Sequence, residues 1–543
     1  MSFTYARQNL EGSERLLERA LEVLPAAISW SLLMLFVILC VAAPVAGVVA
    51  VILFDLYWLL RLLYLTIFLV LSYGLLEIER NTKWRGRLTN LTDPGTALPR
   101  TQERLRHLMP FSRERISEKR HLSMLEKLRA GSPDWRELFH LILIPFYREG
   151  YSVLGPTLKA LSGANYPQDR MVIVLGIEER AGKPARELGE RLKREYGKDF
   201  FHFEICVHPE GIPGESEVKG ANATYAAKWA RDFFEAHRTP LEHIIISCFD
   251  SDTVVSPEYF ACVSYHYLAH PRRTQASFQP IPVYHNNLWE VPAFARVLET
   301  GSSFLQLIEA TDPEMLVTFS SHSMSFKALV EVGYWPVDLV SDDSAIFWKS
   351  FLAFDGNYRV EPLPVTISMD VAMGRNFWET CRTIYQQKRR WAWGVENFPI
   401  FTRGLFANPR ISLWRKVRHA FRLLEMNVSW AVWTPMMLIL SWTPVLVMTR
   451  EFSGSVAYFN APRITAVICN LAGTAVVVSI ILSLLLLPRR TKPVPFLKKL
   501  GFALEWFLLP ITATLFGALP ALDAQTRLAL GWYLEFFITP KRR

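Results

Sequence analysis

A long apolar stretch near the N-terminus constrains this chain more than any other feature. Residues 27–76 are almost continuously apolar, and about 20 such residues cross the hydrocarbon core of a bilayer, so the stretch predicts two membrane spans. We expect the spans at 27–53 and 56–76, with the turn at Asp55. The preceding residues are charged and amphipathic, which favours a retained anchor over a cleavable signal peptide.

The remaining composition indicates a mixture of membrane and water-soluble parts. Half of the 543 residues are hydrophobic, yet one fifth are charged. Arg80, Lys83, Arg85 and Arg87 follow the second predicted span and place the large middle segment on the cytoplasmic side by the positive-inside rule. No nucleic-acid module accompanies the net charge of +9. We therefore expect an integral protein of the cell membrane that contacts lipids and not nucleic acid.

The middle segment alternates short β-branched runs with helical patterns. The runs lie at 141–144, 171–175 and 243–248, and helical patterns lie at 186–196 and 221–237. This alternation is typical of an α/β fold with a parallel-rich sheet.

An amphipathic pattern follows this segment. Apolar residues from Leu413 to Leu424 share one helical face, and cations from Arg415 to Arg422 lie off it. The pattern predicts a membrane-surface helix, although a helix packed on the soluble domain gives the same pattern. Further spans are expected at 428–447, 464–487 and 501–519, with a basic cytoplasmic loop at 489–499.

These observations predict five regions. They are an N-terminal amphipathic segment with two transmembrane helices at 1–79, a basic juxtamembrane segment at 80–137, a cytoplasmic α/β domain at 138–400, an interfacial amphipathic helix at 401–427, and C-terminal transmembrane helices with a tail at 428–543.

Asp250 and Asp252 directly follow the β-branched run at 243–249. Open α/β sheets bind their ligands at the carboxyl ends of the strands, and hard carboxylate oxygens there suit Mg²⁺ or Mn²⁺ carrying a diphosphate. An isolated D-x-D triplet is more often a solvated turn, so its neighbours decide its meaning.

Other candidate site residues also follow predicted strands or open helices. Tyr147 and Glu149 follow the first strand, and Glu178 ends the second, where a nucleotide base or ribose would lie. Lys219 opens a helix, and a cation at a helix N-terminus attracts phosphate, although a surface lysine beside a helix cap is an equally good interpretation.

A separate acidic pair, Asp342 and Asp343, lies downstream on another loop. Sugar transfer needs a carboxylate that takes the proton of the acceptor hydroxyl, apart from the acids that hold a metal. Gln387, Arg390 and Trp391 then offer an amide, a guanidinium for phosphate and an indole face for a sugar ring.

The order of Asp250-Ser251-Asp252, Ser341-Asp342-Asp343 and the Q-x-x-R-W run ending at Trp391 resembles that of membrane-integrated family-2 glycosyltransferases of the cellulose, chitin and hyaluronan synthase type, over about residues 138–400. The resemblance implies a GT-A-like fold and an inverting transfer from a UDP-sugar, with Mg²⁺ or Mn²⁺, to a growing glycan or a lipid acceptor. It implies the following roles: metal binding for Asp252 and Asp250, the catalytic base for Asp343, nucleotide binding for Tyr147, Glu149, Glu178, Lys219 and Asp250, and acceptor or diphosphate binding for Gln387, Arg390 and Trp391.

Two positions depart from the family pattern. The usual D-D-G after the second strand is replaced by Gly176-Ile177-Glu178, and the acid before the base is Asp342 instead of Glu. The first departure leaves the uridine contact open, and the second is closer to hyaluronan synthases without identifying the sugar.

The C-terminal tail resembles the F-x-V-T-x-K gating element of cellulose synthases, through Phe536, Ile538, Thr539 and Lys541, with Ile538 in the Val position. Three crossings after residue 428 would leave this tail outside. Either Pro510 and Pro520 break the last apolar segment into a re-entrant or returning pair, or the match is a coincidence.

Three functions remain open from the sequence. The first is a processive polysaccharide synthase that also translocates its product. The second is a non-processive enzyme that adds one sugar to a lipid, since related enzymes carry similar motifs. The third is a transporter or scaffold with a catalytically inactive α/β domain.

Overall fold

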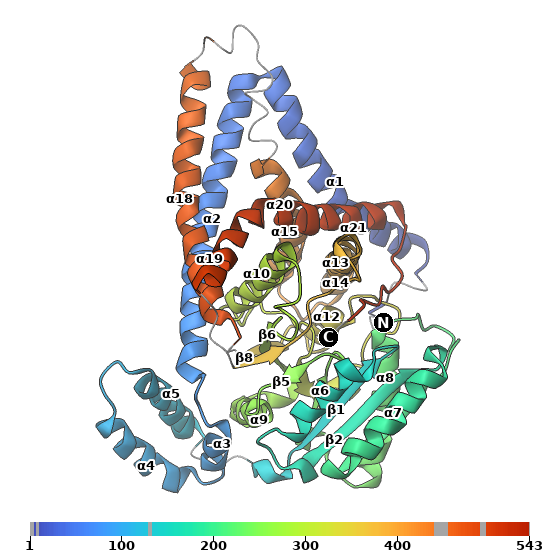
Figure 1. The fold of residues 1–543 in the computed structure, drawn as a ribbon. Helices are drawn as coiled ribbons and strands as arrows, with labels where there is room; N and C mark the ends of the chain where they lie inside the picture. Colours follow the sequence, from blue (N-terminus) through green and yellow to red (C-terminus); the bar gives the residue numbers. More distant parts are fainter. Residues whose placement is uncertain are drawn as a thin grey trace.

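A computed structural model of the chain describes residues 5, 6, 10–128, 133–438, 454, 456–488 and 496–541. Its centre is an eight-stranded sheet in the order β3-β2-β1-β4-β7-β6-β8-β5 (Figure 1). Strands β1 to β4 pair in parallel, as do β6 and β8, whereas β7 pairs antiparallel with β4 and β6, and β5 antiparallel with β8. The strands are β1 (Phe139–Phe146), β2 (Met171–Glu178), β3 (His202–His208), β4 (Ile244–Cys248), β5 (Val254–Val255), β6 (Ala276–Val283), β7 (Ser323–Ser325) and β8 (Arg359–Ser368).

Both faces of the sheet are buried. Ile142 and Leu175 belong to the core on one face, and Leu141 and Val174 to the core on the other. Successive strand residues point to opposite faces, so the apolar runs of β1 and β2 fill both cores. The covering helices are α6 (Tyr151–Ser162), α7 (Lys183–Tyr196), α8 (Lys219–Ala236), α9 (Tyr259–Ala269), α10 (Ala293–Glu309), α11 (Phe326–Glu331), α12 (Asp342–Ala353), α13 (Phe377–Ala392) and α14 (Asn397–Ala407).

The predicted fold class is confirmed. The chain has an α/β domain with a GT-A-like, parallel-rich sheet next to helices that are long and apolar enough to cross a membrane. The predicted strands at 141–144, 171–175 and 243–248 lie within or overlap β1, β2 and β4, and the helical patterns at 186–196 and 221–237 correspond to α7 and α8.

Three long apolar helices extend away from the domain, namely α1 (Gly12–Ala42), α2 (Pro44–Glu79) and α18 (Val456–Leu486) (Figure 1). The turn between the first two lies at Ala43 and Pro44, so the expected turn at Asp55 is wrong. Proline opens a helix readily because its missing N–H would have no partner in the first turn. Asp55 lies inside α2 and is buried.

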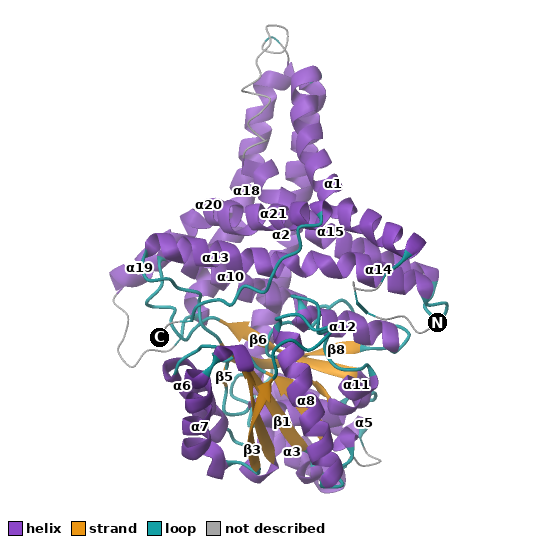
Figure 2. Cartoon of the chain, turned by 90° about the vertical axis from the view of Figure 1, so that its right-hand side faces the viewer, coloured by secondary structure: helices purple, strands orange, loops and turns teal. Residues whose placement is uncertain are grey.

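The last apolar segment is long enough to cross a membrane by composition, and it stays helical through α19 (Phe496–Glu505), α20 (Leu509–Ala513) and α21 (Leu519–Leu530). Pro510 and Pro520 stand in the first turns of α20 and α21, and a π-helical turn lies between these helices. The segment runs across the foot of the long helices (Figures 1 and 2). Ion pairs Arg296–Glu505 and Arg389–Asp523 join it to α10 and α13 of the domain.

Four further helices connect the domain to the long apolar helices. They are α3 (Trp84–Thr92), α4 (Pro94–His107), α5 (Arg113–Lys127) and α15 (Leu413–Leu438). The first of these packs on the domain, where the Trp84 ring lies 5.3 Å from that of Tyr265 in α9. The described part of the predicted span at 428–447 continues α15 to residue 438. Residues 439–447 and the basic residues 489–492 lie outside the described residues.

Candidate active site

Several of the predicted site residues meet at the carboxyl ends of the central strands. Asp250 and Asp252 follow β4, and the loop after β8 lies beside them, because the backbone N–H of Asp370 donates to Asp252 Oδ2 over 2.9 Å. Asn286, which follows β6, donates to the backbone oxygen of Asp252 and to Asp370 Oδ1. Asp252 is therefore buried and held from two other strand ends.

Lys219 joins the two predicted acidic motifs. Its ammonium lies 2.8 Å from Asp250 Oδ1 and donates to both carboxylate oxygens of Asp343, at 3.0 and 3.1 Å. Burial opposes its charge, but Asp250 and Asp343 raise the pKa of Lys219 well above its ordinary value. Acids from two loops far apart in the sequence thus share one cation.

Asp250 is ionised and firmly held. Burial raises the pKa of its carboxyl, but Lys219 and Lys541 outweigh that effect and lower the pKa below its usual range. The hydroxyl of Ser320 donates to Asp250 Oδ2 over 2.5 Å, and the backbone N–H of Asp250 donates to Ser321 Oγ. Ser321 has a φ of 62°, a left-handed conformation that is uncommon outside glycine.

The C-terminal tail reaches the same edge of the sheet. Lys541 Nζ lies 2.7 Å from Asp252 Oδ1 and donates to Ser251 Oγ over 3.2 Å. Although burial opposes its charge, Asp252 and Asp250 raise the pKa of Lys541. Phe536 lies under the Arg390 guanidinium at 4.8 Å, Thr539 is buried and Ile538 is half-buried. The tail therefore ends on the side of the α/β domain.

The ends of β1 and β2 form an aromatic and cationic corner. The guanidinium groups of Arg148 and Arg180 lie 4.7 and 4.9 Å from the centre of the Tyr147 ring. Glu178 forms an ion pair with Arg180. Glu149 accepts from Ser251 Oγ over 3.0 Å and from the backbone N–H of Tyr147 over 2.7 Å. Glu149 thus connects this corner to the D-x-D loop.

Two glycines near the ends of β2 and α8 lie close to neighbouring groups. A Cβ at Gly176 would lie 2.6 Å from Asn222 Oδ1, while the Asn222 amide donates to the Gly176 carbonyl over 2.9 Å. Gly220 is equally constrained, because a Cβ there would lie 2.4 Å from the Pro336 carbonyl oxygen. Gly220 of α8 therefore lies too close to the loop before Asp342 for a side chain, whereas Gly176 of β2 is crowded only by the Asn222 side chain of that helix.

Asp342 and Asp343 differ sharply in exposure, although both lie in the first turn of α12. The Asp343 side chain is 24% exposed, whereas Asp342 is 2% exposed. Burial, followed by the charge of Asp343, raises the pKa of Asp342 to about 8. Asp343 is thus the acid of this pair that solvent or a ligand can reach.

Helix α13 carries Gln387, Arg390 and Trp391. Gln387 is buried, whereas Arg390 and Trp391 are half-buried. The Lys388 ammonium lies 3.7 Å above the Trp391 ring and forms a buried ion pair of 2.8 Å with Glu299. Lys388 thus covers one face of the indole and fixes its position against α10.

A family comparison agrees with this arrangement. Residues 245–488 match the family model described as Glycosyl transferase family group 2, which covers slightly less than half of the chain. The predicted resemblance to family-2 glycosyltransferases is confirmed. The matching segment includes the D-x-D loop, Asp343 and the Q-x-x-R-W run, as expected for such a transferase domain.

Solved glycosyltransferase structures also align with the chain. A mannosyltransferase from Pyrobaculum calidifontis, in complex with GDP-Man and Mn²⁺, is 13% identical over 82% of this chain and 99% of that one, with a TM-score of 0.40. S. aureus TarS in complex with UDP is 10% identical over 62% of this chain and 90% of that one, with a TM-score of 0.36. No curated protein sequence matches the chain. These similarities identify no substrate of this chain.

Sequence reasoning missed several residues that shape the site, including Ser320, Asn286, Lys388 and Arg180. Asp370 was also missed, although it follows β8 closely, just as Asp250 follows β4, so the same strand-end rule would have found it. Ser320 and Asn286 have no such signal, since polar residues in loops are common.

Proposed function

We propose that the chain is an inverting, metal-dependent glycosyltransferase that uses a UDP-sugar to extend a polysaccharide at the cytoplasmic face of a membrane. The observation that carries the proposal is the Lys219 ammonium between Asp250 and Asp343. Lys219 thereby contacts both the D-x-D motif, which suits a cation and diphosphate, and Asp343, an accessible acid that suits proton transfer.

In the proposed reaction, Asp343 takes the proton of the acceptor hydroxyl as that oxygen attacks the anomeric carbon. The new bond forms on the face opposite the leaving diphosphate, whose bond to the sugar breaks and whose oxygen keeps the electron pair. Lys219 can exchange a carboxylate for a phosphate oxygen, because its ammonium donates equally well to either group. The leaving UDP would then be held by Lys219 and by Arg390 of α13.

The carboxylates of the D-x-D motif are suitable ligands for a divalent cation. Asp250 and Asp252 offer hard carboxylate oxygens, and each already lies within 2.8 Å of a lysine ammonium. Among the described residues, no group of three or more His, Cys, Asp or Glu side chains has the geometry of a metal site. Mg²⁺ commonly takes one or two carboxylates and completes its shell with water and substrate phosphates. When bound, such a cation would neutralise charge on the diphosphate.

The neighbouring groups fit the remaining parts of the substrates. The Tyr147 ring, with Arg180 and Glu178 beside it, offers a stacking surface and polar partners for a nucleoside. Glu149 would contact the same nucleotide. Trp391 would face the acceptor sugar, with the indole held in place by Lys388, and Gln387 would lie nearer the diphosphate.

The tail fits a gate over the nucleotide, because Phe536 and Lys541 contact Arg390 and Asp252 of the site. The helices that can cross a membrane support coupling of synthesis to translocation of the polymer. The second candidate, transfer of one sugar to a lipid, is favoured by the position of the domain directly below these helices (Figure 2). The length of the product distinguishes a polysaccharide synthase from an enzyme that adds one sugar to a lipid.

The test is to incubate the purified protein in nanodiscs with a panel of UDP-sugars and Mg²⁺ or Mn²⁺, and to size the product. A polymer supports the synthase, a single added sugar on a lipid supports the second candidate, and failure to transfer or hydrolyse any donor supports an inactive domain. Asp343→Asn should lower turnover by about 10²-fold or more with UDP binding retained. Asp232→Asn, an exposed acid on α8, is the control.

A further inference from the structure

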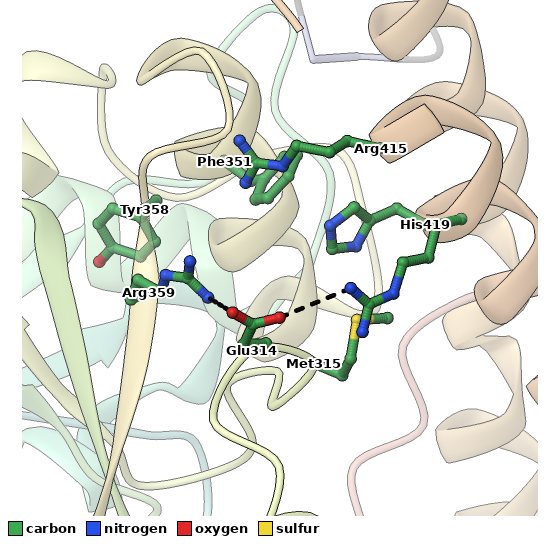
Figure 3. A pocket seen from close by; sticks show the side chains of 8 residues that line it. Glu314, Met315, Phe351, Tyr358, Arg359, Arg415 and His419 are labelled. Carbon is green, nitrogen blue, oxygen red and sulfur yellow. Dashed lines mark ion pairs between the residues drawn. The ribbon is translucent and has the colours of Figure 1, made fainter. Parts of the chain in front are cut away.

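A basic cavity lies between helix α15 and the domain, apart from the proposed active site. It has a volume of about 240 Å³. Figure 3 shows Arg415 and His419 of α15 on one side, with Tyr358 and Arg359 on the other. This volume is below the roughly 300 to 1,000 Å³ of sites for drug-sized ligands, so the cavity suits a small group or one end of a larger molecule.

The cavity is separate from the catalytic acids. Arg359 begins β8, whereas Asp370 and Asp252 lie beyond its other end. A strand of 10 residues spans roughly 30 Å at about 3.3 Å per residue. A ligand in the cavity therefore occupies a second site.

Positive charge in the cavity exceeds negative charge. Glu314 is the one acid among the eight described residues that line it, and it lies 3.5 Å from both Arg359 and Arg418. Arg415 donates to the Gly356 carbonyl but has no ion pair among the described residues. Burial, followed by the charge of Arg359, lowers the pKa of Arg415. The cationic groups thus lack a full set of anionic partners.

His419 supplies an independent sign of a missing ligand. It is 6% exposed, lines the cavity, and its Nδ1 atom has no hydrogen-bond partner among the described residues. A buried polar atom without a partner is costly, and such atoms are rare in folded proteins. The cavity therefore has a buried, unsatisfied polar atom beside three arginines.

The opposite face of α15 indicates where the ligand comes from. Leu413, Trp414 and Phe421 are 67%, 73% and 66% exposed. They lie on the face of α15 opposite the cations that line the cavity. An exposed apolar stripe with aromatic residues, next to helices that can span a membrane, is typical of a helix at the bilayer surface. The exposed stripe of α15 therefore suits contact with a bilayer, with the cavity on the side of the helix towards the domain.

We propose that the cavity formed by Arg359, Arg415, Arg418 and His419 binds the phosphate group of an anionic membrane lipid. Guanidinium groups bind phosphate oxygens through paired, charge-assisted hydrogen bonds. The acyl chains of the same lipid would pass around α15 towards its apolar stripe. The bound lipid holds the α/β domain at the membrane surface, independently of catalysis.

Binding of phosphatidylglycerol and of phosphatidylcholine to the purified full-length protein tests the proposal, by native mass spectrometry and by the shift in melting temperature. Phosphatidylglycerol should bind the original protein more tightly than phosphatidylcholine. Arg415→Gln should weaken that binding by about tenfold, the effect expected for loss of one charged hydrogen bond. Arg410→Gln, which removes a 78% exposed guanidinium just before α15, should leave it unchanged.

Two further measurements complete the test. Arg418→Gln, at a 46% exposed side chain, should also weaken phosphatidylglycerol binding and leave the fold intact, since exposed substitutions rarely disturb folding. Equal binding of the two lipids, or full binding by both variants, would overturn the proposal. Inorganic phosphate and glycerol phosphate are the competitors: if either binds as tightly as the lipid, the site is for a soluble phosphate and the lipid assignment is wrong.

Discussion

The ammonium of Lys541 lies 2.7 Å from Oδ1 of Asp252, a residue 289 positions earlier in the chain. This contact fixes the C-terminal tail beside the D-x-D loop. It also places one positive charge where the D-x-D motif is proposed to hold a divalent cation. The lysine and the cation are therefore alternative partners of the same carboxylate oxygen.

Lys541→Met should strengthen the binding of Mn²⁺ alone by about tenfold, because it removes a charged hydrogen bond that competes with the metal. Calorimetry or the electron paramagnetic resonance signal of free Mn²⁺ measures this directly. Lys183→Met removes an 86% exposed ammonium outside the site and should have no effect. Unchanged or weaker Mn²⁺ binding by Lys541→Met would show that Asp252 is not a metal ligand.

Asp342→Asn should make the stability of the protein less sensitive to pH. An unfolded aspartate loses its proton near pH 4, whereas the pKa of Asp342 in the folded protein is raised to about 8. Between these values the folded state holds an extra proton, so stability falls as the pH rises through this window. The amide cannot ionise and removes this contribution.

The measurement is the melting temperature of both proteins at pH 5.5 and 8.5. The melting temperature of Asp342→Asn, relative to that of the original protein, should be higher at pH 8.5 than at pH 5.5. Asp232→Asn, at a 66% exposed side chain, should shift both values equally. A higher melting temperature of Asp342→Asn at pH 5.5 alone would contradict the raised pKa of Asp342.

Trp391→Ala should reduce transfer to the acceptor more than it reduces binding of the donor, because the indole is proposed to stack on the acceptor sugar. Initial rates at saturating donor and the dissociation constant of UDP provide the comparison. Trp378→Ala, at a 78% exposed ring, controls for loss of a tryptophan. Equal losses of both functions, with a lower melting temperature, would instead assign Trp391 to the core.

Glu299→Gln should destabilise the protein by about 3 to 5 kcal/mol, because it leaves the Lys388 ammonium buried without its carboxylate. The two side chains are only 1% and 3% exposed. Replacing both, in Glu299→Leu with Lys388→Met, should recover most of this loss. Thermal unfolding measures each variant against Glu187→Gln, which alters an exposed pair. A double variant as unstable as the single one would show that packing, not the uncompensated charge, dominates.

Local patterns in the sequence predicted much of the fold. The apolar runs of β1, β2 and β4 and the amphipathic helices α7 and α8 were expected from periodicity, because each pattern repeats within a few residues. The strand-end position of Asp250 and Asp252 followed from the same patterns. The turn expected at Asp55 was misplaced, since one buried acid can lie inside a long helix while Pro44 starts it.

Contacts between distant segments were not visible in the sequence. The antiparallel insertion of β7 between β4 and β6, and the placement of the last apolar segment across the domain, depend on partners far away in the chain. A run of apolar residues has the same composition whether it crosses a bilayer or lies on a domain, so composition cannot distinguish these outcomes.

The sequence by itself therefore determined the class of fold, the presence of apolar segments long enough to cross a membrane, and the motifs that resemble family-2 glycosyltransferases. Only the tertiary structure decided that Lys219 joins Asp250 to Asp343 and that Lys541 reaches Asp252. Hydrophobic periodicity acts over neighbouring residues, whereas these ion pairs form because close packing of α8, α12 and the tail brings charges from remote parts of the chain within hydrogen-bond distance.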